Sequence, residues 1–518
     1  MSTKSGTSSQ CSYLDRLDLG VLNAAIPTEL VDEVVEQAGC REQRHRRLPA
    51  RAVVYFVLGL CLFSAADRFC PPGYQAVIRT LSRRWRGVVC GVGHVTSSAL
   101  TQARQRLGAK PLQMLFERLC GPACEQPRPW SHAFGRRLVA WDGTTIAVSD
   151  SADNATAFGY HGRSADGSEA VFCTDAPKRG GGAATGANPL VRLMTVVECG
   201  SHAIIDAVFD GVARASEQAL ARRLLAGLTR GMLLLADRNF FNYPMWNAAL
   251  GTGADLLWRV KATNLFVPTK HLADGSYLAI LPTPAETRRL GAVRADCGRN
   301  EVPRAGHLVR VIEFTITIQT DNGDTRTEDY RLATTLLDPD EAPADQLAAL
   351  YHERWEAENS NSELKPRLIG ADVTLRSRTP DGVAQEIYAF LAIYQALTAL
   401  RVQAAATRHL DPDRISFLIT VRAVREDLTD RSTRSQRQRR RNVIAEMINN
   451  RLGPRRPRTS PRQRVPHSNK YPSKRRDQPR RPSTKIRTEI TVTEPRERPF
   501  KPGRRPRPSL GREPTRGA

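Results

Sequence analysis

The spacing of apolar and polar residues predicts a helical first part. From 18 to 125 the apolar residues recur at helical intervals, with helices expected at 29–36, 97–107 and 112–119. The longest apolar run, 52–66, has Arg51 and Asp67 at its borders. It is too short to cross a bilayer and predicts a buried helix.

Between 136 and 260 the pattern changes to strands that alternate with helices. A buried strand around Asp142 is followed by two strands, a helix, a strand, a helix and a strand, at 190–199, 202–210, 215–229, 232–236, 243–251 and 254–260. Three strands that can pair antiparallel, continued by strand, helix and strand, are the order that a ribonuclease H-like fold requires.

Residues 261–338 switch to short alternating segments with turns such as DNGD at 321–324, which predicts a β-rich block. Helices at 344–365 and 383–406 then resume the α/β pattern. The predicted fold is α/β: a ribonuclease H-like domain interrupted by a β-rich insertion. Its parts are a helical domain (18–125), the α/β domain in two pieces (126–260 and 339–430), the insertion (261–338) and a tail (431–518).

The tail holds nearly all of the net charge. Residues 431–518 contain 28 Lys and Arg against 6 Asp and Glu, whereas the preceding 430 residues contain 49 against 47. The tail also has 13 of the 33 prolines and few large apolar residues, so we expect it to be mostly disordered. A polybasic segment binds nucleic-acid phosphates without reading sequence; the alternative is a solubilising or RNA-binding tail.

Two aspartates occupy strand positions where a carboxylate needs a partner. Asp142 interrupts the apolar and β-branched run LVAWDGTTIAV, and Asp237 ends the run MLLLAD. A buried acid is costly unless it binds a cation or is fully hydrogen-bonded. The carboxyl ends of strands in open α/β sheets are where ligands bind. Each aspartate alone also fits a strand-end turn or a helix cap.

A third acid stands on the predicted helix YHERWEAENSNSELK. At about 100° per residue, one stripe about 60° wide holds Tyr351, Arg354, Glu358 and Lys365. The other glutamates of the helix (Glu353, Glu356 and Glu363) fall on the far side. Pro366 is expected to end or kink the helix. A carboxylate between cations suits a metal-assisted phosphodiester site, although a surface helix with salt bridges has the same spacing.

These blocks resemble the DDE transposases of the insertion sequence 4 family. The family's hallmark is Tyr, two residues, Arg, three residues, Glu, six residues, Lys, and all intervals match here. DGT at Asp142 and DRNF at Asp237 match its two aspartate blocks, with Asn239 where many relatives have Gly. LPARAVVYFVLGL (48–60) and SALTQARQRLGAKPLQMLFERL (98–119) resemble the family's amino-terminal region. The resemblance covers about 18–430, and it implies a β-rich insertion between the second Asp and the Glu.

The expected chemistry follows from three converging carboxylates, which repel one another unless divalent cations neutralise them. Oxygen ligands and a phosphate substrate favour Mg²⁺, with Mn²⁺ as a substitute. Two ions about 3.5–4 Å apart would activate water or a 3′-hydroxyl and stabilise the leaving 3′-oxygen. Asp142 is expected to bridge both ions, with Asp237 and Glu358 completing one each. Phosphate contacts are expected from Tyr351, Arg354, Lys365 and, unless it forms a structural ion pair, Arg238.

The function predicted is that of a cut-and-paste DNA transposase acting on double-stranded DNA, at the element's terminal inverted repeats and at the target. The resemblance implies a homodimer that bridges two ends, with a hairpin intermediate as an option. The helix pair at 97–119 would touch DNA through Gln102, Arg104, Gln105 and Arg106, or it is a bundle with a solvated basic face. Two alternatives are a DNA-binding remnant that acts through its basic tail and a metal-dependent nuclease that does not join strands.

The cysteines and the first residues indicate the compartment. Ten cysteines occur without a CxxC pair, which favours reduced thiols over a zinc site. Residues 1–20 lack the apolar region of a signal peptide. We expect a cytoplasmic, nucleoid-associated prokaryotic protein without membrane attachment.

Overall fold

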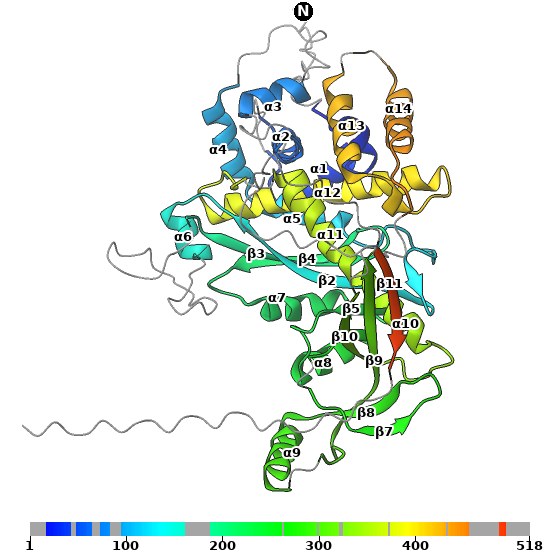
Figure 1. Ribbon diagram of the computed structural model, residues 1–518. Coiled ribbons are helices and arrows are strands. Elements are labelled where there is room, and N and C mark those ends of the chain that lie inside the picture. Colours follow the sequence, from blue (N-terminus) through cyan, green and yellow to red (C-terminus); the bar gives the residue numbers. More distant parts are fainter. Residues whose placement is uncertain are drawn as a thin grey trace, which may run out of the picture.

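A computed structural model describes most of the chain. The described residues are 17–42, 48–64, 73–82, 95–160, 187–261, 264–297, 300–320, 325–370, 373–430, 432, 434–454 and 486–493. Figure 1 shows a helical part above a long sheet whose lower end carries the inserted strands.

The helical part combines segments from both ends of the chain. Its helices are η2 (Gly20–Ala24), α1 (Thr28–Gln37), α2 (Ala50–Leu62), α3 (Tyr74–Leu81), α4 (Ser97–Leu107), α5 (Lys110–Leu119), α12 (Pro380–Ala406), η6 (Pro412–Arg414), α13 (Phe417–Thr429) and α14 (Gln436–Asn449). The predicted buried helix is α2, which is buried at all but one of its residues and packs on α12. Within the described chain, α12 has the length and hydropathy of a membrane span, but 83% of that window is buried, as in a core helix.

The central sheet is continuous, in the order β4-β3-β2-β5-β6-β10-β9-β8-β7. Its strands are β2 (Arg136–Ala147), β3 (Leu190–Glu198), β4 (Ile204–Gly211), β5 (Met232–Ala236), β6 (Asp255–Arg259), β7 (Pro268–His271), β8 (Tyr277–Pro282), β9 (Gly306–Thr320) and β10 (Thr325–Thr334), with the short β1 (His132–Ala133) beside β2. Strands β2, β3 and β4 pair antiparallel, whereas β5 and β6 run parallel to β2. The mixed α/β class predicted from the sequence is confirmed.

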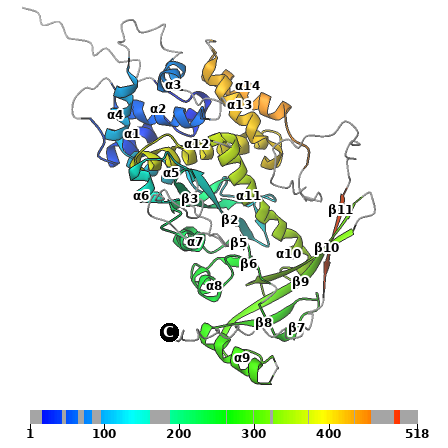
Figure 2. The same cartoon turned by 60° about the vertical axis from the view of Figure 1, so that its left-hand side comes forward.

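Helices cover both faces of the sheet, because alternate residues of its strands point to opposite sides. The apolar core on one face includes α7 (Glu217–Leu224), η3 (Leu225–Gly227) and α8 (Tyr243–Leu250). The other face belongs to the core that α12 and the amino-terminal helices share, with α6 (Ala152–Phe158) at its edge. Figure 2 shows the sheet between these two layers.

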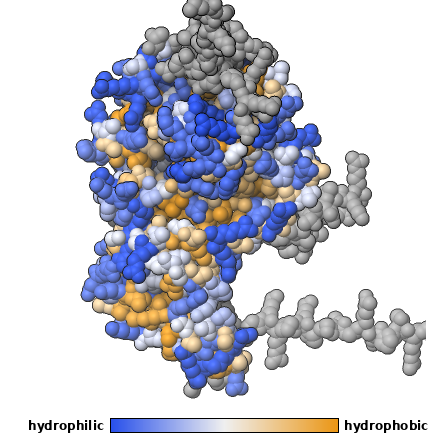
Figure 3. All heavy atoms as spheres, turned by 180° about the vertical axis from the view of Figure 1, so that it is seen from behind, coloured by the Kyte–Doolittle hydropathy of each residue, from blue (hydrophilic) through white to orange (hydrophobic). Residues whose placement is uncertain are grey.

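The inserted block extends the sheet instead of standing apart, because β10 pairs antiparallel with β6. It also contains a helix that the β-rich pattern did not predict, α9 (Pro284–Cys297). The sequence PAETRRLGAVRADC has proline at its first position and then mostly good helix formers, so local propensity accounts for α9. Seen from behind, hydrophilic residues dominate the upper part of the molecule, and apolar patches lie mainly in its middle and lower parts (Figure 3).

The helix predicted over 344–365 changes its winding along its length. It comprises α10 (Ala344–Leu350), the 3-10 turn η4 (Tyr351–Arg354), α11 (Trp355–Ser362) and the π-helix η5 (Glu363–Gly370). Of the two outcomes expected at Pro366, an end or a kink of the helix, the first does not occur, because Pro366 lies inside η5. Proline clashes with the carbonyl four residues back in an α-helix, whereas the hydrogen bonds of a π-helix span five residues.

Two described segments of the tail form regular structure, and the expectation that the tail as a whole is mostly disordered stays a prediction. Helix α14 packs on α13 through Arg439, whose guanidinium Nε lies 2.6 Å from Oδ1 of Asp427 in a buried ion pair. Strand β11 (Ile486–Val492) pairs antiparallel with β9 and contacts α10. Residues 455–485 and 494–518 lie outside the described part.

Candidate active site

The sheet brings Asp142 and Asp237 to adjacent positions. Ala140 of β2 pairs with Leu235 of the parallel strand β5, so each aspartate lies two residues beyond the same rung. Asp142 is within β2, and Asp237 follows directly after β5. Helix α11, which carries Glu358, packs on β2. The three acids therefore lie on neighbouring elements, where β2 and β5 pass beneath α11.

Asp142 faces α11 and is mostly buried. Asn361 of α11 donates a hydrogen bond from Nδ2 to Oδ2 of Asp142 over 2.9 Å. Burial raises the pKa of Asp142 above its ordinary value; the negative charge of Glu358 raises it further, and the bond from Asn361 opposes both. The carboxylate of Glu358 is thus close enough to disfavour the charged form of Asp142.

Gly143 allows a close approach on the opposite face of β2. A Cβ atom at this position would lie 2.5 Å from Oε1 of Glu217, the first residue of α7. This distance is far below a van der Waals contact, so a larger residue here would require the Glu217 side chain to move. Gly143 thus leaves room for the Glu217 side chain beside Asp142.

Arg354 and Glu358 share one side of the helix, as their spacing predicted. Nη2 of Arg354 lies 2.9 Å from Oε1 of Glu358, and the guanidinium lies 4.9 Å from the ring centroid of Trp355. Burial alone would lower the pKa of Arg354, but Tyr351, Glu358 and Asp237 raise it above its ordinary value. Arg354 is therefore a cation held between two of the acids.

Tyr351 has a different contact from the one predicted. Its side chain is buried, and its hydroxyl donates a hydrogen bond to the carbonyl of Ala236 over 3.1 Å. Burial raises the pKa of Tyr351 well above its ordinary value. This hydrogen bond fixes the end of β5 beside Asp237, and the contact of Tyr351 with a DNA phosphate stays a prediction.

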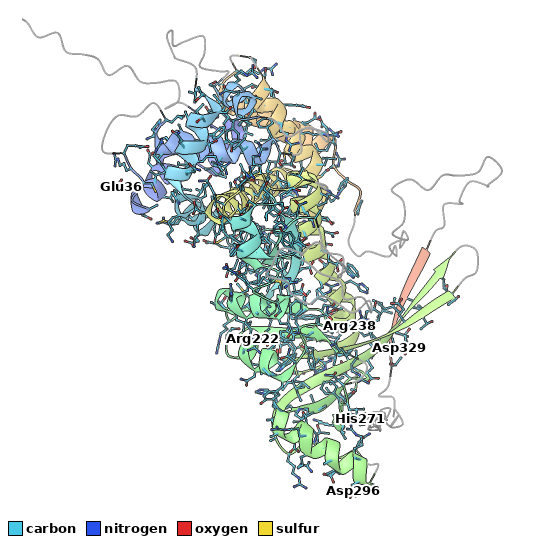
Figure 4. All side chains as sticks on the ribbon, turned by 90° about the vertical axis from the view of Figure 1, so that its left-hand side faces the viewer. Glu36, Arg222, Arg238, His271, Asp296 and Asp329 are labelled. Carbon is cyan, nitrogen blue, oxygen red and sulfur yellow. The ribbon has the colours of Figure 1, made fainter. Side chains whose placement is uncertain are left out.

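Lys365 and Arg238 have less defined surroundings. Lys365 lies in the π-helix η5, where residues no longer advance by 100°, so its predicted angle does not apply. It is half-buried, and burial lowers its pKa. Arg238 is exposed in the turn after β5, in the middle of the molecule (Figure 4). Beside it, Asn239 is not at positive φ, so nothing at this position requires glycine.

Two contributors near the acids were missed by the sequence analysis. Asn361 is three residues after Glu358, and helical spacing alone would have placed it on that side. Arg259 ends β6, and its guanidinium lies 4.1 Å from the ring centroid of Tyr330. The positive charge of Arg259 acts on Tyr351. The rule that drew attention to Asp237, a polar residue at the carboxyl end of a strand, applies equally to Arg259.

The far side of the helix is buried and ion-paired. Nε2 of His202 lies 2.7 Å from Oε2 of Glu356, and Nδ1 lies 2.9 Å from Oε2 of Glu363. These contacts confirm the expectation that Glu356 and Glu363 lie on a different side of the helix from Glu358. Both glutamates are buried and bind His202.

The described residues contain one group with the geometry of a closed metal site: His202, Glu356 and Asp413, whose possible ligand atoms lie within 4.8 Å of one another. A metal ligand needs a neutral imidazole with a free nitrogen lone pair. In His202 both nitrogens face carboxylates, and its pKa is raised to about 9 against the opposing effect of burial. The surroundings of His202 therefore favour a protonated imidazole over a metal-bound one.

The two aspartates of the sheet and Glu358 of α11 have the chemistry of a divalent-cation site. Asp142, Asp237 and Glu358 offer only oxygen ligands, which hard cations prefer. Burial first, and then the charge of Glu358, raises the pKa of Asp142, and a bound cation would stabilise its charged form.

The helix pair at 97–119 is confirmed as α4 and α5, but Arg104 does not face DNA. Its guanidinium is buried against α12, where it donates hydrogen bonds to Gln385 and Glu386, and also to Tyr74 and Ser377. The other three predicted residues, Gln102, Gln105 and Arg106, are exposed on α4.

A mixed sheet with two aspartates beneath a Tyr-Arg-Glu-Lys helix defines the class of DDE transposases. Residues 133–395 match the family described as Transposase DDE domain, and residues 16–117 match Insertion element 4 transposase N-terminal. The chain belongs to the insertion sequence 4 family of DDE transposases, enzymes that move DNA and depend on a divalent metal.

Individual relatives agree. The chain is 25% identical over 407 residues to the Transposase InsG for insertion sequence element IS4 of Escherichia coli (strain K12), covering 78% of this chain and 81% of the relative. It also aligns with a cryo-EM structure of the piggyBac transposase synaptic complex with hairpin DNA, at 8% identity and a TM-score of 0.39, over 85% of this chain and 86% of that one. The second likeness is too weak to bear on the fold or the site.

Proposed function

We propose that this transposase cuts DNA at the ends of its insertion sequence and joins the ends to a target through Asp142, Asp237 and Glu358. The observation that carries the proposal is the hydrogen bond from Asn361 to Asp142, which joins two motifs 219 residues apart in the sequence. It brings the strand of the first aspartate under the helix of the glutamate.

Each residue has a distinct part. Asp142 is the central metal ligand, oriented by Asn361, and Asp237 and Glu358 complete the ligand set. Two Mg²⁺ ions, or Mn²⁺ in their place, would supply a nucleophile at neutral pH and stabilise the leaving oxygen. Arg354, Lys365 and Arg238 bind phosphates, and Tyr351 supports the end of β5.

The reaction has two phosphoryl-transfer steps. Water attacks the phosphorus at the element's end, the bond to the 3′-oxygen breaks, and the 3′-hydroxyl is freed. That hydroxyl then attacks a phosphodiester of the target DNA, forming one phosphodiester and releasing another 3′-hydroxyl. In both steps the acids would hold the metal ions and Arg354 the reacting phosphate.

The fold suggests the division of labour. We propose that β4-β3-β2-β5-β6 is the ribonuclease H-like core, with its α/β domain split into 126–260 and 339–430 by the insertion at 261–338. The helical domain (18–125) binds DNA through the exposed side of α4. We further propose a homodimer that holds two inverted repeats, in the cytoplasm at the nucleoid; the described cysteines carry free thiols.

The basic tail is proposed to bind DNA phosphates. It contributes a net +22 of the chain's +24. Removing residues 494–518, beyond β11, should lower the affinity for unrelated DNA and flatten its dependence on salt. An unchanged salt dependence would remove the tail from DNA binding.

Cleavage of a labelled duplex that carries the element's end tests the central function. With Mg²⁺ the wild type should cut and with EDTA it should not, and Asp142→Ala and Glu358→Gln should abolish cutting. Glu353→Gln, on the same helix, is the control that keeps activity. Binding without cutting in Mg²⁺ and in Mn²⁺ would instead favour a DNA-binding remnant.

A further inference from the structure

The most heavily paired charges near the catalytic helix lie on the side that faces away from the acids. His202 is 1% exposed and sits in the turn between β3 and β4, at a φ of 65°. A non-glycine residue adopts this left-handed conformation only where its surroundings hold it there. The surroundings here are two glutamates of one helix, seven residues apart.

We propose that His202 is a positioning residue for Glu358: by holding Glu356 and Glu363 against the β3–β4 turn, it fixes the rotation and the height of the catalytic helix over the sheet. This inference rests on the proposed function, in which Glu358 is a metal ligand. Glu356 is two residues before Glu358, so a rotation of α11 that breaks the contact to His202 also displaces Glu358.

The turn that bears His202 is itself anchored to the strand of the first aspartate. The backbone N–H of His202 donates to the carbonyl of Glu198 over 2.9 Å. The buried carboxylate of Glu198 pairs with Arg137 of β2 and accepts a hydrogen bond from Ser201. A chain of buried polar contacts thus runs from β2, which carries Asp142, through the turn to the helix that carries Glu358.

The cluster is nearly balanced in charge. Glu356 and Glu363 face His202, and Nη1 of Arg401 lies 3.0 Å from Oε2 of Glu363. Tyr394 donates to the same oxygen over 3.1 Å, and Asn359 donates to Glu356 over 2.8 Å. The other charged groups nearby are Asp413 and, 4.0 Å from Glu363, Arg367. Buried ions are stable only when their charges are compensated. Removing the imidazolium of His202 would therefore leave uncompensated negative charge in the cluster.

A role in stability alone and a role in positioning differ in what they do to metal binding. A structural residue lowers the melting temperature and leaves the affinity of the folded protein for metal unchanged. A residue that orients a ligand-bearing helix changes that affinity, and losses of about 10- to 100-fold are typical for groups that support metal ligands.

The test measures Mn²⁺ binding by electron paramagnetic resonance, and the Mn²⁺ concentration that half-saturates cleavage, for the full chain on end DNA. His202→Gln should weaken Mn²⁺ binding by about 10-fold or more. His202→Gln/Glu356→Gln, which removes one charge of each sign, should recover most of that loss. Arg104→Gln breaks a different buried ion pair, between α4 and α12, and should lower only the melting temperature.

Wild-type Mn²⁺ affinity in His202→Gln, or a loss that the double variant does not recover, would overturn the proposal. Should His202→Gln fail to fold, Glu356→Gln alone removes the charged link to α11 and is expected to weaken Mn²⁺ binding in the same way. The variant Glu358→Gln distinguishes a failure of the proposed function from a failure of this inference. If it binds Mn²⁺ like the wild type, the proposed function fails; if only the His202 variants do so, this inference alone fails.

Discussion

Nδ2 of Asn361 lies 2.9 Å from Oδ2 of Asp142, and this hydrogen bond joins the catalytic helix to the strand of the first aspartate. Asn361 is one helical turn beyond Glu358, so a single turn of α11 supplies both a proposed metal ligand and the donor that orients another. The amide thus fixes the orientation of the Asp142 carboxylate.

Replacing Asn361 should therefore reduce catalysis more than stability. Asn361→Ala removes the donor and should slow single-turnover cleavage by about 10- to 100-fold. Asn361→Asp should be worse, because a further carboxylate beside Asp142 repels it. Ser362→Ala, at the next and exposed position, is the control. Wild-type cleavage rates in both Asn361 variants would show that Asp142 needs no orientation.

Asp142 should destabilise the metal-free protein at neutral pH. Its pKa is raised in the folded state, first by burial, so the folded protein favours the protonated acid. The stabilisation from that proton is present below the unfolded pKa and is lost as pH rises through the folded pKa. Asp142→Asn in EDTA should raise the melting temperature at pH 7 and less so at pH 4. Asp345→Asn, an exposed site on α10, should do neither.

The account fails on this point if Asp142→Asn lowers the melting temperature in EDTA. That outcome would mean that the charged carboxylate of Asp142 stabilises the fold through its hydrogen bonds and needs no cation.

The His202 cluster should make stability fall in alkaline solution. The pKa of His202 is raised from 6.5 to about 9, so its stabilisation is complete below about 6.5 and is lost as pH rises through about 9. The upper bound of the loss is about 3 kcal/mol in the free energy of unfolding. Urea unfolding between pH 6 and 10 measures it. His202→Gln should flatten this part of the profile, and an equally steep profile in that variant would contradict the assignment.

Strand β11 should support the helix that leads into the signature. Ile490 and Val492 pack on the core, and β11 contacts α10, which continues directly into Tyr351. Ile490→Asp should expose the edge of β9 and increase amide hydrogen exchange at 314–320. Thr491→Asp, at the adjacent exposed position, should not. Equal exchange in the two variants would mean that β11 does not hold this edge.

The sequence predicted the parts of the site whose signal is local. The apolar runs around Asp142 and before Asp237 identified β2 and β5, and helical spacing placed Arg354 beside Glu358, as the 2.9 Å contact confirms. These features depend on residues a few positions apart, where backbone geometry alone decides which side chains meet.

Contacts between distant segments could not be predicted. His202 has no motif around it, and its partners are 154 and 161 residues away. Arg104 was predicted to contact DNA because α4 is polar. Instead, Arg104 is buried against α12 and pairs there with Glu386. The tail has a composition typical of disorder, yet strand β11 and helix α14 form because β9 and α13 offer an edge and a partner. In each case the deciding residue lies in another part of the chain.

The most direct test is anomalous diffraction from crystals of the protein with cleaved end DNA and Mn²⁺. The account predicts peaks within ligand distance of carboxylate oxygens of Asp142, Asp237 and Glu358, and none at the group of His202, Glu356 and Asp413. A peak at that buried group, with none at the sheet, would contradict both the metal site and the role of His202.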